Sequence, residues 1–528
     1  MPQYYPMVHT AFWAEYRLFG SHAAGYHLVN VAIHALDALL LSVVLRRLGV
    51  RAAWLAAAVF AVHPVQVESV AWVTELKNVL STAFYLGAAL CFIRFLELGT
   101  GGRDGPPDAG TPRHWSSYAF GSLLYVAALL SKTVTASFPA AVLLVTWWKR
   151  RRLAIRDVLP LVPLFAAGAA AGLATAWIEK HHVGAAGKAW DLGAAERFLI
   201  AGRAVWFYAG KLVFPWPLIF VYPRWHLDAG APLQYVPVAA AIALVAALWL
   251  ARKRIGSGPL VAVLFFGGTL VPALGFFDVY PMRYSFVADH FQYLASAGLI
   301  ALFAAAAALA AERFRLPGPA LASLILAILA SLTWRQARIY RDAETLWRDT
   351  LAKNPSAWMA QTNLGEILVS RGQVDEGVAL YREAIRLEPT LVEPRLNLGE
   401  TLLAQGKAAE AITLMEETVR LYPDNPAARY NLGTAYLKTG RTGEGVSELT
   451  RATELQRGFV EAEYNLGVAL LLADRLDEAA AHLREAIRLN PSHGPAHRNL
   501  ARVLERQGRL AEAASEREVG LRLENRRD

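Results

Sequence analysis

Ten apolar runs occupy the first 335 residues, and they restrict the fold more than any other feature of the chain. They lie at 28–45, 52–62, 79–96, 118–130, 136–148, 158–177, 233–250, 259–277, 294–311 and 317–333. Runs of roughly 18–22 apolar residues cross a hydrocarbon core of about 30 Å as helices. Three runs, at 52–62, 118–130 and 136–148, are short for a full span, which indicates tilted, interrupted or extended helices. The pattern predicts an all-α, polytopic membrane domain of about ten spans at residues 1–335.

Basic residues gather in alternate connections between the runs. They are Arg46, Arg47, Arg51, Arg94, Arg103, Arg113, Lys149, Arg150, Arg151, Arg152, Arg156, Arg252, Lys253, Arg254, Arg313 and Arg315. The positive-inside rule assigns such loops to the cytoplasm. The N-terminus and everything after Thr333 are therefore expected on the other, outer side of the membrane.

The formal net charge of +9 does not indicate a nucleic-acid partner. The basic excess lies in these short loops, whereas residues 351–528 carry slightly more acidic than basic side chains. Basic loops beside apolar runs direct membrane insertion, so lipid is the expected surrounding. Cys91 is the only cysteine, which excludes an internal disulfide, a thiolate metal site and a redox pair.

A second pattern follows the last apolar run, where the triplet Asn-Leu-Gly recurs every 34 residues. Its asparagines are Asn363, Asn397, Asn431, Asn465 and Asn499, the last being followed by Leu-Ala. A glycine keeps the same period at Gly372, Gly406, Gly440 and Gly508, with Asp474 in the remaining position. A 34-residue period is typical of tetratricopeptide repeats. We expect repeats at 358–391, 392–425, 426–459, 460–493 and 494–527, after a connecting helix or degenerate repeat at 336–357.

Helix pairs of this kind bury their apolar faces by stacking, which predicts an α-solenoid with a concave groove. Such a groove suits an extended peptide or a helix and is a recognition architecture rather than a site of chemistry. The five asparagines of the triplet are our candidates for binding an acceptor. The expected partner is a protein or peptide on the outer side of the membrane.

Three polar sets lie in loops that the charge pattern assigns to the outer side. The first contains His63 and Glu68, the second Lys132, and the third Arg283 together with Asp289, His290 and Tyr293. On one shared face, a carboxylate could act as a general base and a cation could neutralise a phosphate. The alternative is that these residues are interface anchors and helix caps. Asp37, inside the first run, is expected to be paired within the bundle.

Residues 195–213 form an amphipathic stretch inside a long outer loop. At helical spacing Phe198, Trp206 and Leu212 share one face, whereas Ile200 and Phe207 lie opposite and weaken the pattern. The stretch indicates either a helix in the plane of the membrane interface or a plain linker.

Several motifs together resemble the transmembrane and tetratricopeptide-repeat O-mannosyltransferase family, with its bacterial members most similar. They are Leu18-Phe19-Gly20, Gly25-Tyr26-His27-Leu28-Val29-Asn30, His63-Pro64 with Glu68-Ser69-Val70-Ala71-Trp72, Lys77-Asn78-Val79, Leu130-Ser131-Lys132, Tyr222-Pro223-Arg224-Trp225 and Ala288-Asp289-His290-Phe291-Gln292-Tyr293. The resemblance implies a GT-C-type glycosyltransferase fold in a bacterial inner (cell) membrane, with the repeats periplasmic. It implies transfer of a mannose-like sugar from a polyprenyl-phosphate carrier to a protein Ser or Thr hydroxyl, the repeats presenting the acceptor.

The resemblance also suggests roles for individual residues. Glu68, His63 and Glu15 are the catalytic candidates. Lys132, Arg283, His290 and Asp289 are the candidates for binding the donor phosphate. No metal ligand is assigned, and whether a divalent metal assists is left open.

The chain departs from the family pattern at its start. The family's acidic motif, which follows the first span, would lie upstream of Met1, and Glu15 is the only carboxylate in the part of that loop that is present. Residues 1–24 therefore indicate a missing preceding span, from a mis-assigned start codon or a truncated gene. Enzyme activity depends on that upstream motif. The alternative is a non-catalytic, membrane-anchored repeat scaffold or pseudoenzyme for envelope proteins.

Overall fold

The computed structural model describes residues 5–99, 114–183 and 191–524, and these residues form helices and turns with no strands. The predicted all-α fold class is therefore confirmed. The chain divides into two compact units, Met1–Pro355 and Ser356–Asp528. Arg103 and Arg113 of the predicted cytoplasmic loop, and residues 525–527 of the fifth repeat, lie outside the described residues.

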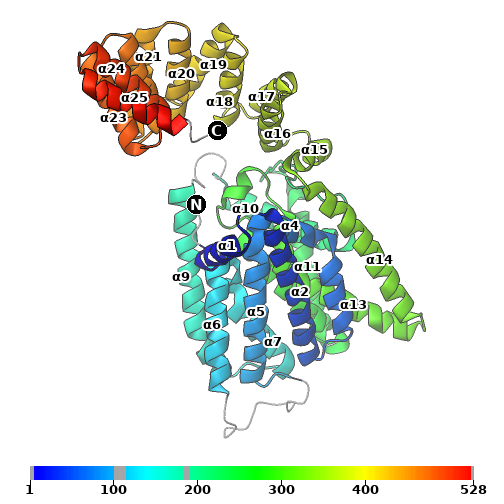
Figure 1. Cartoon of the computed structure of the whole chain (residues 1–528). Helices are drawn as coiled ribbons and strands as arrows, with labels where there is room; N and C mark the ends of the chain where they lie inside the picture. The colour runs from blue at the N-terminus through cyan, green and yellow to red at the C-terminus, as the bar shows by residue number, and fades with distance from the viewer. Residues whose placement is uncertain (1–4, 100–113, 184–190, 525–528) are drawn as a thin grey trace. The chain divides into compact units, whose positions relative to one another are not determined.

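The first unit is a bundle of long helices joined by short helical turns. Its α-helices are α1 (Pro6–Phe19), α2 (Ala23–Arg47), α3 (Ala53–Val62), α4 (Val67–Ala71), α5 (Leu76–Phe95), α6 (Trp115–Ser131), α7 (Phe138–Arg150), α8 (Ile155–Val158), α9 (Val162–Ile178), α10 (Ala194–Val213), α11 (Val236–Ile255), α12 (Gly258–Leu270), α13 (Tyr293–Arg313), α14 (Gly318–Ala337) and α15 (Ala343–Lys353). In Figure 1 α2 runs beside α5, and α5 beside α6. Helix α13 packs against α3 and α12 and completes the centre of the bundle.

Six helical segments among the described residues are long and apolar enough to cross a membrane. They are Ala23–Arg47, Val73–Phe95, Ile155–Val183, Pro232–Ile255, Asp289–Arg313 and Gly318–Tyr340. A bent pair, Ala53–Val62 with Pro64–Ala71, gives a seventh if it is counted as one span, and Trp115–Ser131 and Gly258–Ala273 are shorter apolar helices. The expected number of about ten spans stays a prediction.

The bent pair turns by 53° at His63 and Pro64. Proline clashes with a helical conformation of the residue before it. His63 accordingly has an extended backbone, with φ −79° and ψ 129°, and a short 3₁₀ turn, η1 (Pro64–Gln66), follows it. The bend explains why the apolar run at 52–62 is short, and it directs α4 and Glu68 into the interior of the bundle.

Apolar side chains cover the outside of the bundle as well as its inside. Leu39 on α2 and Ile242 and Leu250 on α11 are about two-thirds or more exposed. Within its most apolar stretch, the segment Pro232–Ile255 has no buried residue at all. Exposed apolar helices of this length are expected where lipid rather than water is the surrounding solvent.

Helix α10 covers the amphipathic stretch predicted from the sequence, but it packs through a different face. Ile200 and Tyr208 are fully buried, whereas Phe198, Trp206 and Val213 are exposed. The face named from the sequence is therefore largely exposed, and the opposite side, which is also apolar, packs against the bundle. A position of this helix in the membrane interface stays a prediction. The exposed aromatic side suits the membrane interface.

The second unit consists of five helix pairs. They are α16 (Trp358–Ser370) and α17 (Val374–Leu387), α18 (Glu393–Ala404) and α19 (Ala408–Leu421), α20 (Pro426–Lys438) and α21 (Thr442–Leu455), α22 (Val460–Leu472) and α23 (Leu476–Leu489), and α24 (Gly494–Arg506) and α25 (Leu510–Glu524). The repeat glycine lets the two helices of a pair meet closely, since a Cβ on Gly433 would lie 2.7 Å from Leu449 Cγ. The turn between the helices needs a positive φ, which is 78° at Gly440 and 61° at Asp474. Aspartate is among the few non-glycine residues that tolerate this conformation.

Candidate functional site

The three polar sets named from the sequence meet at one end of the bundle in the first unit. Asn78 at the start of α5 accepts a hydrogen bond from the Lys132 ammonium group, which joins the first set to the second. Glu68 on α4 contacts His290, which joins the first set to the third. The cluster is formed where α5 begins, where α6 ends and where the 3₁₀ turn η10 (Asp289–Gln292) precedes α13.

Glu68 and His290 form a buried carboxylate–imidazole pair. His290 Nδ1 lies 2.8 Å from Glu68 Oε1, and the backbone N–H of His290 donates to Oε2 at 3.2 Å. An ionised carboxylate can only accept, so Nδ1 carries the proton and Nε2 keeps its lone pair in the neutral ring. Trp72 packs against the imidazole at a ring-centroid distance of 6.0 Å. We call Glu68 and His290 the dyad.

A second carboxylate lies directly beside the dyad. Asp289 accepts hydrogen bonds from the Tyr222 hydroxyl, at 3.0 Å to Oδ1 and 3.1 Å to Oδ2. Burial raises the pKa of the Tyr222 hydroxyl well above its ordinary value, so Tyr222 stays a proton donor. Burial lowers the pKa of Lys211, and the negative charge of Asp289 opposes that shift. Asp289 therefore adds a second carboxylate beside that of Glu68, with the Lys211 cation nearby.

A network of amides and charges holds Lys132 in place. Asn78 Nδ2 donates to Glu75 Oε2 at 2.5 Å and to Ser69 Oγ at 3.2 Å, so its Oδ1 is oriented toward Lys132. Glu75 Oε1 also pairs with Lys77 at 2.7 Å. Burial lowers the pKa of Lys132 to about 8, although the carboxylate of Glu75 counteracts that shift. Lys132 is therefore a positioned cation that is charged at neutral pH.

Two of the remaining predicted site residues, His63 and Glu15, make no hydrogen bond to this network among the described residues. His63 uses both ring nitrogens on the backbone, with Nε2 3.1 Å from Leu212 O and Nδ1 accepting from Val65 N–H at 3.4 Å, which gives it a structural role at the bend. Glu15 is buried on α1, and neither carboxylate oxygen has a hydrogen-bond partner among the described residues. Burial raises the pKa of Glu15 to about 7. Arg283 is half-buried at the end of η9 (Tyr280–Arg283).

The repeat asparagines are engaged with neighbouring side chains or backbone. Asn363 donates to Met359 O, and Asn431 donates to Glu400. Asn397 bonds the hydroxyl of Tyr381, and Asn465 and Asn499 bond tyrosines of the preceding repeat. Asn431, Asn465 and Asn499 thus line the seam between first helices. The role of the five asparagines in binding an acceptor stays a prediction.

Sequence reasoning gave no individual catalytic or binding role to Tyr222, Glu75 and Asn78, which the structure places in the cluster. Tyr222 belongs to a motif quoted for the family resemblance, and Glu75 and Asn78 lie close to Glu68 in the sequence. Their positions in or next to these motifs were the sequence signal that could have identified them as members of the cluster. Which of them point into the cluster depends on the rotation of each helix.

A polar triad lies deeper in the bundle. The Tyr293 hydroxyl donates to Asp37 Oδ2 at 2.8 Å and lies 2.6 Å from His34 Nδ1. Asp37 is fully buried on α2, so the expectation that it is paired within the bundle agrees with this contact. The triad connects α2 to Tyr293, the first residue of α13.

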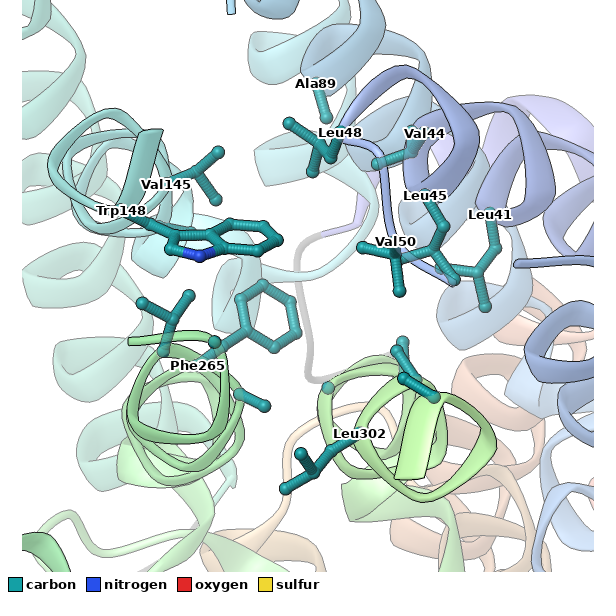
Figure 2. Close-up of a pocket in the computed structure, with 18 of the residues that line it drawn as sticks. Leu41, Val44, Leu45, Leu48, Val50, Ala89, Val145, Trp148, Phe265 and Leu302 are labelled. Carbon is teal, nitrogen blue, oxygen red and sulfur yellow. The ribbon is translucent and has the colours of Figure 1, made fainter. Parts of the chain in front are cut away.

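An apolar cavity of about 520 Å³ lies within the bundle. Helices α2, α5, α7, α12 and α13 line it, and Figure 2 shows Trp148 and Phe265 reaching into it opposite Leu45 and Val50. Along α13 the lining extends from Leu294 to Leu309, a rise of about 22 Å. Leu294, the first lining residue on α13, follows His290 by four residues.

No group of three or more His, Cys, Asp or Glu side chains suited to a metal ion occurs among the described residues. The contacts above are therefore organised by hydrogen bonds and ion pairs. The cluster can hold a proton on His290, orient it through Glu68, and offer a cation at Lys132. That combination suits transfer of a group that leaves as an anion.

Family models described as "Tetratricopeptide repeat" match residues 368–417 and 402–469, and residues 329–391 and 464–517. The second unit is thus a set of tetratricopeptide repeats, as the 34-residue period predicted. The match to residues 329–391 includes the segment at 336–357.

Two curated proteins are similar to part of the chain. A protein O-mannosyl-transferase of Caenorhabditis elegans is 32% identical over 100 residues, which cover 18% of this chain and 14% of that protein. A protein O-mannosyl-transferase of Drosophila melanogaster is 33% identical over 132 residues, covering 24% of this chain and 13% of that protein. The chain thus matches about a seventh of the length of these relatives. Over that part, the resemblance drawn from the motifs is confirmed.

Among solved structures, the crystal structure of MamA is 24% identical and covers 31% of this chain and 96% of that chain, with a TM-score of 0.29. The crystal structure of YrrB, described as a TPR protein with an unusual peptide-binding site, is 21% identical. It covers 34% of this chain and 91% of that chain, also with a TM-score of 0.29.

Proposed function

We propose that this protein is a membrane glycosyltransferase that moves a mannose-like sugar from a polyprenyl-phosphate carrier to a Ser or Thr hydroxyl of a protein outside the cytoplasm. The observation that carries the proposal is that one bundle contains both a buried cluster of charged and polar groups and an apolar cavity. A lipid-linked sugar has a charged phosphate next to a long apolar chain. The cluster and the cavity offer matching surroundings to the two parts, and Leu294 of the cavity lining follows His290 by four residues.

The dyad is the proposed source of general base catalysis. Glu68 positions His290, and His290 Nε2 accepts the proton of the acceptor hydroxyl as its oxygen attacks the anomeric carbon. The bond between that carbon and the phosphate oxygen breaks, and the lipid phosphate leaves as an anion. The Lys132 ammonium group stabilises the negative charge on the leaving phosphate. Asp289, with Tyr222, is close enough to the dyad to orient a sugar hydroxyl.

The cavity is the proposed place for the first part of the carrier chain. Its lining is almost entirely aliphatic and aromatic, with Arg51 at the far end as the one charged lining residue. Each buried methylene contributes about 0.8 kcal/mol. A chain that fills the cavity therefore gives the donor most of its affinity, while the cluster supplies the specificity for the phosphate.

The alternative function is a non-catalytic scaffold that recruits envelope proteins through the repeats. One observation favours it, because both oxygens of Glu68 are occupied by His290, as they would be in a purely structural network. In that case the polar cluster only stabilises the fold. The repeats would then be the whole functional surface.

The deciding experiment uses the full chain in lipid nanodiscs with radiolabelled polyprenyl-phosphate mannose and an envelope protein extract. If the sugar is transferred, radiolabel should appear in the protein fraction, and mild alkali should release the labelled sugar from Ser and Thr. His290→Gln should abolish that label without lowering the amount of folded protein. If the wild-type chain retains the lipid donor but never labels protein, or if His290→Gln labels as well as wild type, the proposed reaction is wrong and the scaffold function gains support.

A further inference from the structure

The first helices of the five repeats form the inner side of the solenoid. Helices α16, α18, α20, α22 and α24 each contact the next first helix along the series. Successive second helices, such as α17 and α19, make no comparable contact among the described residues. Because the first helices approach one another more closely, they line the concave side.

Hydrogen bonds between successive first helices show which side chains border this groove. Asn431 donates to Glu400 at 2.7 Å, and Asn499 donates to the Tyr464 hydroxyl at 3.0 Å. Asn465 donates to both Tyr430 and Thr434, at 3.3 and 3.1 Å. Residues three or four positions away along each helix share the same face. The groove surface is therefore given by the second, fifth, sixth, ninth and thirteenth residues of each repeat.

Charge is distributed unevenly along these positions. The first two repeats contribute acidic side chains, which are the exposed Glu366, Glu393 and Glu400. The fifth repeat contributes basic side chains, which are the exposed Arg498, Arg502 and Arg506. In the third and fourth repeats, Lys438 and Glu461 balance each other. The groove is thus acidic at its beginning and basic at its end.

The centre of the groove carries aromatic side chains. Tyr430 packs against Phe459 with ring centroids 5.1 Å apart, and Tyr464 packs against His493 at 4.7 Å. Both tyrosines are half-buried and keep one side open to solvent. Together with the repeat asparagines, they offer apolar contact and amide hydrogen bonds to an extended backbone.

Existing ion pairs do not cancel the charge gradient. Arg498 pairs with Glu524 at 2.8 Å, and Arg506 pairs with Asp474 at 2.5 Å, but all four side chains are at least one-third exposed. Exposed pairs are screened by water, contribute little and exchange readily. Arg502 donates only weakly to Asn499, at 3.4 Å. A ligand carboxylate can therefore compete for this end of the groove.

We propose that the concave face binds an extended peptide that is basic where it contacts the first two repeats and acidic where it contacts the fifth. Packed helices lie roughly 8–10 Å apart, so four intervals span about 32–40 Å, which an extended chain covers with about 10–12 residues. Complementary charge fixes the direction of the peptide and accelerates its encounter with the groove. This binding holds whether or not the chain transfers a sugar.

The test measures peptide binding to the full chain in nanodiscs by fluorescence anisotropy. The probe is a labelled 14-residue peptide with four lysines at one end, four glutamates at the other and a Ser/Ala/Pro centre. It should bind at least about tenfold more tightly than all-basic, all-acidic and uncharged peptides of the same length, and its affinity should fall with salt. Equal binding of the four peptides would overturn the proposal.

Charge reversal locates the peptide on the groove. The double variant Glu366→Lys with Glu393→Lys should weaken binding of the dipolar peptide at least about tenfold. The same variant should bind the all-acidic peptide more tightly than the unchanged chain does. That gain excludes misfolding as the cause. The matched control reverses two exposed glutamates of second helices, Glu376→Lys with Glu410→Lys, and should leave the dipolar peptide unaffected. Equal weakening by both variants would mean that net charge, not the groove, determines binding.

Discussion

Replacing Glu68 with glutamine tests whether this carboxylate acts through His290. Glutamine keeps the size of the side chain and one acceptor oxygen, but it removes the negative charge that accepts the Nδ1 proton at 2.8 Å. A hydrogen bond to a charged group contributes about 1.5–3 kcal/mol. If that energy orients and polarises the base, Glu68→Gln should lower the transfer rate about 10- to 150-fold.

His290→Gln should lower the transfer rate further than Glu68→Gln does, because it removes the base itself. General base catalysis contributes about 10²–10⁴-fold to a rate. The double variant should be no slower than His290→Gln alone, since Glu68 would then have nothing left to position. Glu68→Asp should recover part of the rate because it restores the charge. Initial rates of label transfer at saturating donor measure all four proteins, and thermal unfolding in detergent checks that each is folded.

Two results would refute the dyad. If the rate losses of the single variants multiply in the double variant, the two residues act independently. If Glu68→Gln transfers at the wild-type rate, the carboxylate does not take part in the reaction. In either case Asp289, which lies beside the dyad and is oriented by Tyr222, becomes the carboxylate to test next.

Three further predictions address the cavity, the cation and the repeats. Ala301→Phe should raise the KM for the lipid donor at least about tenfold, because the larger side chain displaces two or more methylenes of the donor from the cavity at about 0.8 kcal/mol each. Ala307 lies outside the cavity lining, so Ala307→Phe should leave this KM unchanged. Lys132 has a pKa of about 8 and is charged only below that pH, so donor KM should rise about tenfold per pH unit above pH 8, and Lys132→Arg should remove that rise. Gly467→Ala should lower stability by about 1–3 kcal/mol in thermal unfolding, because its Cβ would lie 2.6 Å from a leucine side chain, whereas Gly443→Ala has open space and should not destabilise.

The repeats could be predicted closely because a period of 34 residues reports directly on local geometry. Even the exception was informative, since Asp474 occupies a glycine position and adopts the same left-handed backbone. The bend after 52–62 could likewise be anticipated from Pro64. These features depend on neighbours in the sequence.

The site could be predicted in its members but not in its pairings. Glu68 and His290 are 222 positions apart, and nothing in either motif states that they touch. His63 was assigned a catalytic role from its motif, yet both ring nitrogens stabilise the bend. Helix α10 shows why rotation is hard to read here, because lipid and protein interior are both apolar and the pattern no longer marks the packed face.

The 3₁₀ turn η10 carries His290 directly before α13, and α13 forms a wall of the cavity along most of its length. The Tyr293–Asp37 hydrogen bond fixes α13 against α2. The length of α13 that lines the cavity therefore sets the depth that is open to a carrier chain. A carrier whose phosphate is held at the top has about 22 Å of protein-lined depth before Leu309, and any longer tail must pass between helices into the bilayer. Discrimination between carriers then rests on their first few units, whereas total length should have little influence.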